Sequence, residues 1–339
     1  MPKPKVSVLE GRPLLDIASY ARRGPTPHAR LSPAEVSQIA RTVDRVPEAV
    51  VKVLPRGSAE FHSLGAHIGY VGRYGKLELE TDDGERLQGK GVGSQLLEDW
   101  DLDLDEHRRH SSLAAVEGRR PPKLVHKLMF SMPAGIPSKA VLSAARNFLR
   151  EEFGPQHRYA FVLHTDEPHP HVHAIVKAVS EQGIRLHIKK TTLREWRSEF
   201  ARHLRDHGVA ANATERAVRG QRSGHKIDAI YRSMRDPKRY STFMRARAGS
   251  VAEELRKGDV KVEAGKRNLV ETRQDVERGW NAVRDILIAE ARPDIAVKIN
   301  RFLGQMQAPR TERELITERL SRYVDAQRAD PRTRELRAR

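Results

Sequence analysis

Three histidines in one short segment of the chain have the type and spacing that bind a metal ion. His164, His171 and His173 lie close together in the sequence, and imidazole nitrogen suits several divalent metals. A metal held by three histidines keeps coordination positions open for Lewis-acid polarisation of a phosphoryl or carbonyl oxygen. Neutral imidazoles also leave the metal its full positive charge, which is useful against a phosphodiester whose charge grows in the transition state.

The segments on either side of these histidines predict two β-strands joined by a turn. Residues 158–163 and 172–179 are short, mostly apolar runs of the kind that form strands. Residues 167–170 between them contain two prolines, which cannot donate to a sheet. We therefore expect a β-hairpin.

The register of that hairpin decides where the imidazoles point. If it closes with Asp166 opposite His171, then His164 lies directly opposite His173, with their Cβ atoms roughly 5 Å apart. Because strand side chains alternate between faces, all three histidines then project from the same side of the sheet. A lone histidine near a strand end is usually an ordinary surface or core residue, but three on one face favour a metal site. Asp166 is placed to orient one of the ligands.

Composition points to a polyanionic partner. The 339 residues carry 62 Lys and Arg against 45 Asp and Glu, a net charge of +17. Nucleic acid is the default partner of so basic a chain. The chain has no cysteine, which excludes disulfides, thiolate catalysis and cysteine-ligated zinc. No segment resembles a secretion signal or a membrane span, so we expect a soluble, cytoplasmic protein.

The residues alone leave two kinds of phosphodiester chemistry open. A metal-activated water would make the protein a hydrolase. A tyrosine nucleophile would instead form a covalent phosphoprotein intermediate and keep the phosphodiester energy for rejoining.

The order of the expected strands and helices predicts an α+β fold with a largely antiparallel sheet and flanking helices, followed by an α-helical C-terminal region. Hairpins outnumber crossovers in the expected order. We expect strands at 48–54, 75–80, 123–132, 158–163, 172–179 and 183–188, and helices at 58–74, 94–100, 138–153 and from a capping box at 192–195 to Gly208.

One tyrosine in the first of these helices has no place in the core. Phe61, Leu64, Ile68 and Val71 form a single apolar stripe, whereas Tyr70 lies about half a turn away from Phe61. Tyr74 is also off the stripe, though less far.

Three regions follow from the composition along the chain. Residues 1–45 form a basic N-terminal arm with a short helix starting near residue 32, and residues 46–220 form the folded domain. Residues 221–339 form a helical, basic region with a loose tail. That region has either a binding role or a plain packing role.

Several segments resemble motifs of one known family. The run from His164 to His173, followed by an apolar strand, resembles the third motif of the HUH-endonuclease relaxases, and most closely the mobilisation-type relaxases that include the T-DNA border endonuclease. Residues 69–79 are similar to the family's first motif, although Val71-Gly72 replaces the more usual Leu-Ser. Residues 131–135 resemble the second motif, and residues 193–202 with 210–220 resemble the end of such domains.

The resemblance implies a role for individual residues. It implies that Tyr70 is the nucleophile, with Tyr74 as its rival, and that His164, His171 and His173 hold a divalent metal, Mg²⁺ or Mn²⁺. Five further residues would contact DNA, with His169 alternatively supporting a ligand: Arg73, Ser131, His169, Arg216 and Arg219.

The function implied by the resemblance is nicking of one DNA strand at an origin of transfer, with a 5′-phosphotyrosine link, for conjugative transfer or mobilisation. Its partners would be single-stranded DNA at the nick, the origin duplex, accessory relaxosome proteins and a secretion-system coupling protein. Alternatives are a rolling-circle replication initiator with the same chemistry, a phosphoesterase that uses water, and a DNA-binding accessory protein without activity.

Overall fold

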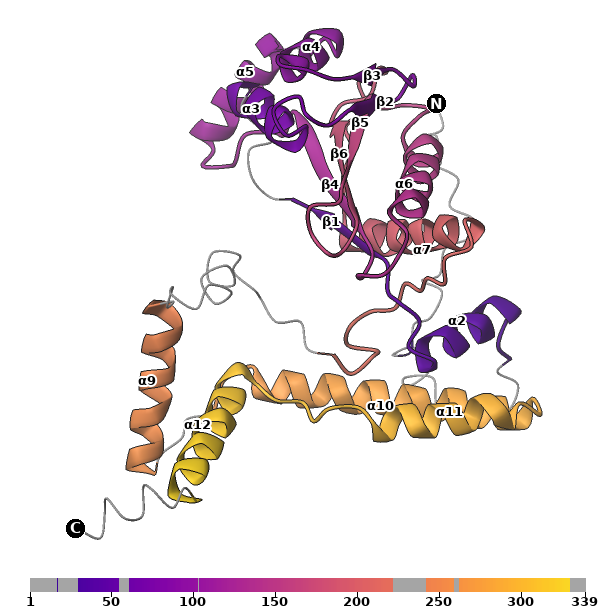
Figure 1. The fold of residues 1–339 in the computed structure, drawn as a ribbon, viewed down its shortest axis with the longest axis vertical. Helices are drawn as coiled ribbons and strands as arrows, with labels where there is room; N and C mark the ends of the chain where they lie inside the picture. Colours follow the sequence, from indigo (N-terminus) through magenta and orange to yellow (C-terminus); the bar gives the residue numbers. More distant parts are fainter. Residues whose placement is uncertain are drawn as a thin grey trace. The chain divides into compact units, whose positions relative to one another are not determined.

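The computed structural model describes residue 17 and residues 30–54, 61–102, 104–221, 242–258 and 262–329. The chain forms two compact units (Figure 1). The first contains residues 33–214, and the second contains residues 16–32 and 215–339. Most of the expected N-terminal arm and the expected tail from residue 330 lie outside the described residues. The expected helix near residue 32 is present as α2 (Pro33–Val43).

A six-stranded antiparallel sheet forms the centre of the first unit. The spatial order of the strands is β1-β4-β6-β5-β2-β3, and each strand is antiparallel to its neighbours. The sheet confirms the predicted α+β class. The strands are β1 (Val50–Val53), β2 (Leu79–Thr81), β3 (Arg86–Leu87), β4 (Val125–Ser131), β5 (Tyr159–His164) and β6 (His171–Lys177).

Two helices cover one face of this sheet, α6 (Ser138–Glu152) and α7 (Lys190–Asp206) (Figure 1). Apolar residues of α6 recur every three or four positions, so one side of the helix is buried. Phe148 of α6 packs edge-on against Trp196 of α7, with ring centroids 6.2 Å apart, and lies 5.1 Å from Phe130 of β4. Removing such a buried ring typically costs about 3–5 kcal/mol.

The opposite face is covered by α3 (Phe61–Val71) and α4 (Val92–Asp99). Leu64, Ile68 and Val71 of the predicted stripe are buried there. A further helix, α5 (Leu104–Val116), follows α4 (Figure 1). Its residues are mostly polar and only Ala114 is buried, so no apolar periodicity marks α5 in the sequence.

The hairpin forms as predicted, but its assumed register is wrong. His164 pairs with His171, and His173 pairs with Val162. Strand β5 ends at His164, so Asp166 lies in the turn and has no strand partner. The shift amounts to two residues, and a strand repeats its facing every two residues. The three histidines therefore still share one face.

Two other predicted strands differ from the structure. Only the end of 75–80 is extended, because Arg73, Tyr74 and Gly75 adopt positive φ angles of 52°, 56° and 85° and form turns after α3. Segment 183–188 forms only an isolated bridge between Val179 and Arg185.

The second unit consists of α9 (Thr242–Lys257), α10 (Lys266–Ala289), α11 (Pro293–Gly304) and α12 (Glu312–Ala329) in its described part. Trp280 of α10 is buried, packs against Phe302 of α11 at 5.3 Å and donates its indole N–H to the carbonyl of Val218. In the part of the chain that the structure describes, no helix is long and apolar enough to cross a membrane.

Candidate metal and nicking centre

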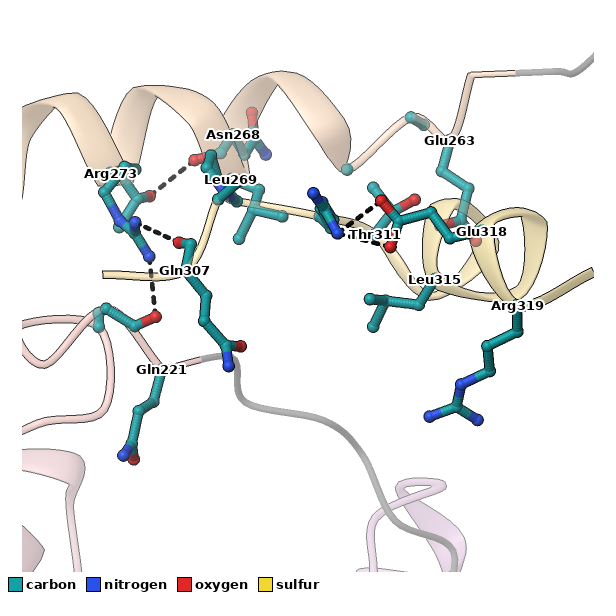
Figure 2. A pocket seen from close by; sticks show the side chains of 18 of the residues that line it. Gln221, Glu263, Asn268, Leu269, Arg273, Gln307, Thr311, Leu315, Glu318 and Arg319 are labelled. Carbon is teal, nitrogen blue, oxygen red and sulfur yellow. Dashed lines mark hydrogen bonds and ion pairs between the residues drawn. The ribbon is translucent and has the colours of Figure 1, made fainter. Parts of the chain in front are cut away.

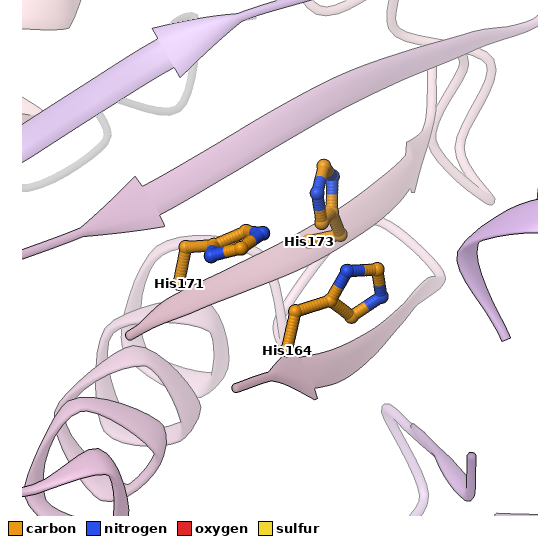
Figure 3. Close-up of side chains that lie close together, drawn as sticks. All are labelled: His164, His171 and His173. Atoms are coloured by element: carbon orange, nitrogen blue, oxygen red, sulfur yellow. The ribbon is translucent and has the colours of Figure 1, made fainter. Parts of the chain in front are cut away.

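The three histidines of the hairpin meet at one end of the sheet (Figure 3). His164 is the last residue of β5, and His171 and His173 lie at the start of the neighbouring strand β6. The ring centroids are 4.7 Å apart for His164 and His173, and 5.2 Å apart for the other two pairs. One nitrogen of each ring lies within 4.8 Å of the others. The residues predicted as ligands therefore come together.

Hydrogen bonds to backbone carbonyls fix the orientation of two of the rings. His164 Nε2 lies 2.7 Å from the carbonyl oxygen of Val71, and His171 Nδ1 lies 3.1 Å from that of His169. Because a carbonyl only accepts, each of these nitrogens carries the proton of a neutral ring. The lone pairs are left on His164 Nδ1 and His171 Nε2. Backbone carbonyls often orient metal-binding histidines in this way.

Burial lowers the pKa of two of the three imidazoles, those of His164 and His173. Desolvation, followed by repulsion from His164 and His171, lowers the pKa of His173 to about 3. Desolvation also lowers the pKa of His164, partly offset by its hydrogen bond to Val71. Both imidazoles are therefore neutral at pH 7. Three nitrogen donors with available lone pairs fit a divalent metal ion.

Arg73 links the histidines to Tyr70. Its guanidinium lies 5.3 Å from the centre of the Tyr70 ring, 3.5 Å from His164 Nδ1, and in an ion pair with Asp166. Tyr70 is the second-last residue of α3, and His164 is bonded to the last residue of that helix. The end of α3 is therefore tied to the metal site by both Val71 and Arg73.

Asp166 has a different contact from the one expected. It pairs with Arg73, and its nearest approach to His164 is 3.9 Å, at the nitrogen that carries the lone pair. The hydrogen bond that orients His164 comes from Val71 instead. Asp166 therefore acts on the site through Arg73.

The two candidate tyrosines differ in their surroundings. Both are exposed, Tyr70 by 49% and Tyr74 by 71%. Tyr70 stacks under Arg73, whereas Tyr74 lines a small cavity of about 240 Å³ with glycines that include Gly69, Gly72 and Gly89. The contact with Arg73 therefore distinguishes Tyr70, since Arg73 is the residue that reaches the histidines.

Strand β4 brings two more polar side chains to the face of the histidines. Ser131, expected to contact DNA, pairs with His171 at the same end of the sheet and is buried. Lys127 lies further along the same face and is only 2% exposed. Burial lowers the pKa of Lys127 to about 8, and burial together with Lys127 lowers that of His67 to about 4. Lys127 was not among the predicted site residues, although it lies four positions before Ser131 in the predicted strand and so shares its face.

The other predicted DNA-contacting residues fall into two groups. His169 is exposed in the hairpin turn, with its ring 5.7 Å from that of His171. Arg216 and Arg219 belong to the second unit. Arg219 donates to Gln221 at 2.7 Å.

Comparison with known proteins finds a similar domain family for part of the sheet-containing unit. Residues 80–209 match the family model "Relaxase: MobA/VirD2-like, nuclease domain". This range includes all three histidines and Ser131 but starts after Tyr70.

Three similar proteins bear the name T-DNA border endonuclease VirD2, from Rhizobium radiobacter, Agrobacterium fabrum (strain C58 / ATCC 33970) and Rhizobium rhizogenes. Each is 24% identical over 184 residues, which is 51% of this chain and 43%, 41% and 42% of the respective relative. The chain thus spans less than half the length of these relatives. Residues 80–209 of this chain are therefore similar to the nuclease domain of the MobA/VirD2-like relaxases.

Proposed function

We propose that this protein is a relaxase that nicks one strand of DNA at an origin of transfer and becomes linked to the 5′ phosphate through Tyr70. One observation carries the proposal: the hydrogen bond from His164 to Val71 joins the three-histidine site to the helix end that bears Tyr70. The relaxase domain match and the endonuclease names of the relatives support the same reaction class.

The proposed reaction is a transesterification. The phenolic oxygen of Tyr70 forms a bond to the scissile phosphorus and gives up its proton, while the bond from phosphorus to the 3′ oxygen breaks. The leaving 3′ oxygen takes up a proton. The number of phosphodiester-type bonds is unchanged, so the link can later be transferred to another 3′ hydroxyl. A divalent ion held by His164, His171 and His173 would supply positive charge to the scissile phosphate.

The protein's own groups have distinct tasks in this proposal. Val71 and His169 accept hydrogen bonds from two ligand rings, which leaves the lone pairs on His164 Nδ1 and His171 Nε2. Arg73 holds the Tyr70 ring by cation–π attraction and is itself fixed by Asp166. The exposure of Tyr70 allows a DNA strand to reach its hydroxyl. Mg²⁺ or Mn²⁺ as the ion, and conjugative transfer or mobilisation as the setting, belong to the proposal.

The test is incubation with labelled single-stranded oligonucleotides that carry candidate nick sites, followed by a denaturing gel. We expect a protein–DNA adduct that requires Mg²⁺ or Mn²⁺ and disappears in Tyr70→Phe. Nicking without any adduct would instead identify a phosphoesterase that uses water. Loss of the adduct in Tyr74→Phe but not in Tyr70→Phe would identify Tyr74 as the nucleophile.

A further inference from the structure

The helical unit contains a large cavity that is separate from the histidine site. It has a volume of about 1100 Å³ and is lined by α10, by the segment that connects α11 to α12, and by α12 itself (Figure 2). All of its lining residues belong to the second unit. Ordinary small-molecule pockets are about 300–1,000 Å³, so this cavity has room for an extended ligand.

Ion pairs within the unit hold the walls of this cavity in place. Arg313 of α12 pairs with Glu254 of α9, and Lys266 at the start of α10 pairs with Glu314 of α12 at 2.8 Å. Lys266 also donates to the carbonyl of Pro309 in the connecting segment, at 2.8 Å. These contacts hold the start of α12 against both α9 and α10, and so they fix the walls of the cavity.

The lining carries an excess of positive charge, with four arginines against two glutamates. Arg273 donates to the backbone carbonyls of Gln307 and Gly220, at 2.6 and 2.8 Å, and these neutral partners leave its charge uncompensated (Figure 2). Arg319 has no ion pair with any residue that the structure describes. The cavity therefore attracts an anion.

The two glutamates of the lining do not cancel this charge. Glu263 forms an ion pair with Arg247 at 2.7 Å, and Arg247 does not line the cavity. Glu318 lies 2.5 Å from Arg310 and 3.6 Å from Arg322. The carboxylate of Glu318 is therefore shared by two arginines of the lining, and the net charge of these three side chains is positive.

The uncharged part of the lining indicates what kind of anion fits. Gln221, Asn268 and Gln307 offer carboxamides, which both donate and accept hydrogen bonds and so match the edges of nucleobases. Leu269, Leu315, Pro309 and three alanines supply the apolar surface, which is about half of the lining. Peptide-binding grooves are mostly apolar, with only a few polar groups, and this lining is not.

We propose that this cavity binds single-stranded DNA, with arginine forks on its phosphates and carboxamides on its bases. Arginine matches phosphate geometry with two parallel donors. A duplex turns its paired base edges inward, whereas a single strand presents them to the carboxamides. The choice of DNA over another polyanion rests on the proposed relaxase function, since nicking produces a single strand that must be held.

The test uses the full-length protein, a short oligothymidylate as the probe, and phenylglyoxal to modify accessible arginines, read out by peptide mass spectrometry. We expect the oligothymidylate to protect Arg319 and Arg322 from modification. Arg267 and Arg278, exposed arginines of α10 outside the lining, serve as the internal comparison and should stay reactive. Equal protection of all four would overturn the proposal.

Binding measurements on variants give an independent readout. The double variant Arg319→Ala/Arg322→Ala should weaken oligothymidylate binding about ten-fold and reduce the salt slope of log affinity by about 1.4, since each phosphate contact to a single strand contributes roughly 0.7. The charge-matched control Arg267→Ala/Arg278→Ala should change the affinity and the salt slope only slightly. An unchanged slope in the Arg319/Arg322 variant would contradict the proposal.

Two comparisons separate this inference from the proposed function and from another ligand class. Tyr70→Phe should lose the covalent adduct but keep the protection of Arg319, so failure of nicking leaves the cavity test intact. A polyglutamate peptide should protect Arg319 less than oligothymidylate does at equal charge concentration. Stronger protection by polyglutamate would assign the cavity to an acidic protein partner and overturn the DNA assignment.

Discussion

His164 donates its Nε2 proton to the backbone carbonyl of Val71 across 2.7 Å, joining residues that are 93 positions apart. The bond connects the end of β5 to the last turn of α3. It fixes which nitrogen of His164 can bind a metal, and it anchors the residue next to Tyr70. A candidate metal site and a candidate nucleophile from different parts of the chain are thereby held together.

Replacement of His173 by alanine should abolish metal binding without unfolding the protein. The ring supplies one of three nitrogen donors, and even residues that only support ligands are worth about 10–100-fold in metal affinity. Isothermal titration with Mn²⁺ measures the effect. His110→Ala, at an exposed position on α5, is the matched control, and an equal loss there would mean that the triad is not the site.

Replacement of Arg73 by glutamine should reduce the rate of adduct formation by about 100-fold, because small misplacements of reacting groups cost on that order. Metal affinity should change far less than in His173→Ala, since arginine is not a ligand. Single-turnover kinetics on an oligonucleotide separate the two effects. Arg86→Gln is the control, an exposed arginine that pairs with Glu78 at 3.6 Å. A normal rate in Arg73→Gln would exclude a positioning role.

Gly75 should tolerate no side chain. A Cβ there would lie 2.3 Å from the carbonyl carbon of Gly89, and its φ is +85°. Gly84 has a similar φ of +87°, but a Cβ would meet nothing within 4 Å. Gly84→Ala therefore measures the backbone strain alone, about 1–2 kcal/mol, and Gly75→Ala should cost clearly more. Urea denaturation measures both; equal costs would mean that the turn after α3 can move away from Gly89.

The stability of the protein should fall as the pH drops from about 6.5 toward 4. Burial first, and then nearby positive charges, lower the pKa of His126 from 6.5 to about 4. The unfolded chain takes up this proton first, so stability is complete above pH 6.5 and is lost progressively below it. The loss is at most about 3 kcal/mol for this residue by pH 4.

Denaturation midpoints at pH 7 and pH 5 test this dependence. His126→Gln removes this titrating group, keeps a donor for the carbonyl of Leu186 and should reduce the loss of stability between those pH values. His110→Ala should leave the dependence as in the wild type. An unaltered slope in His126→Gln would assign the pH dependence to other groups.

The sequence was sufficient for the fold class and for the face shared by the histidines. Apolar periodicity predicted α6 and the strands β4 to β6, because these elements are buried in one core. The common face of His164, His171 and His173 survived a wrong register, since an error of two residues leaves the direction of every side chain unchanged. The wrong register also misplaced Asp166. This residue lies just beyond the end of β5 and has no partner on β6.

Other features depend on contacts that no local pattern encodes. The bond between His164 and Val71 and the bridge from Arg73 to Asp166 join distant segments, and the positive φ values of Arg73 and Tyr74 follow from the turn that closes there. Helix α5 was missed because its residues are mostly exposed and polar. The arginine-lined cavity of the second unit arises only when α12 packs beside α9 and α10.

Mapping the adduct to a peptide shows directly whether Tyr70 attacks the phosphate. Trypsin cuts after Arg73, so Tyr70 and Tyr74 fall on different peptides, residues 57–73 and 74–76. After reaction with an origin oligonucleotide and nuclease trimming, we predict that the nucleotide mass is found on peptide 57–73. Its presence on peptide 74–76, or on neither peptide while nicked DNA accumulates, would show that Tyr70 is not the nucleophile.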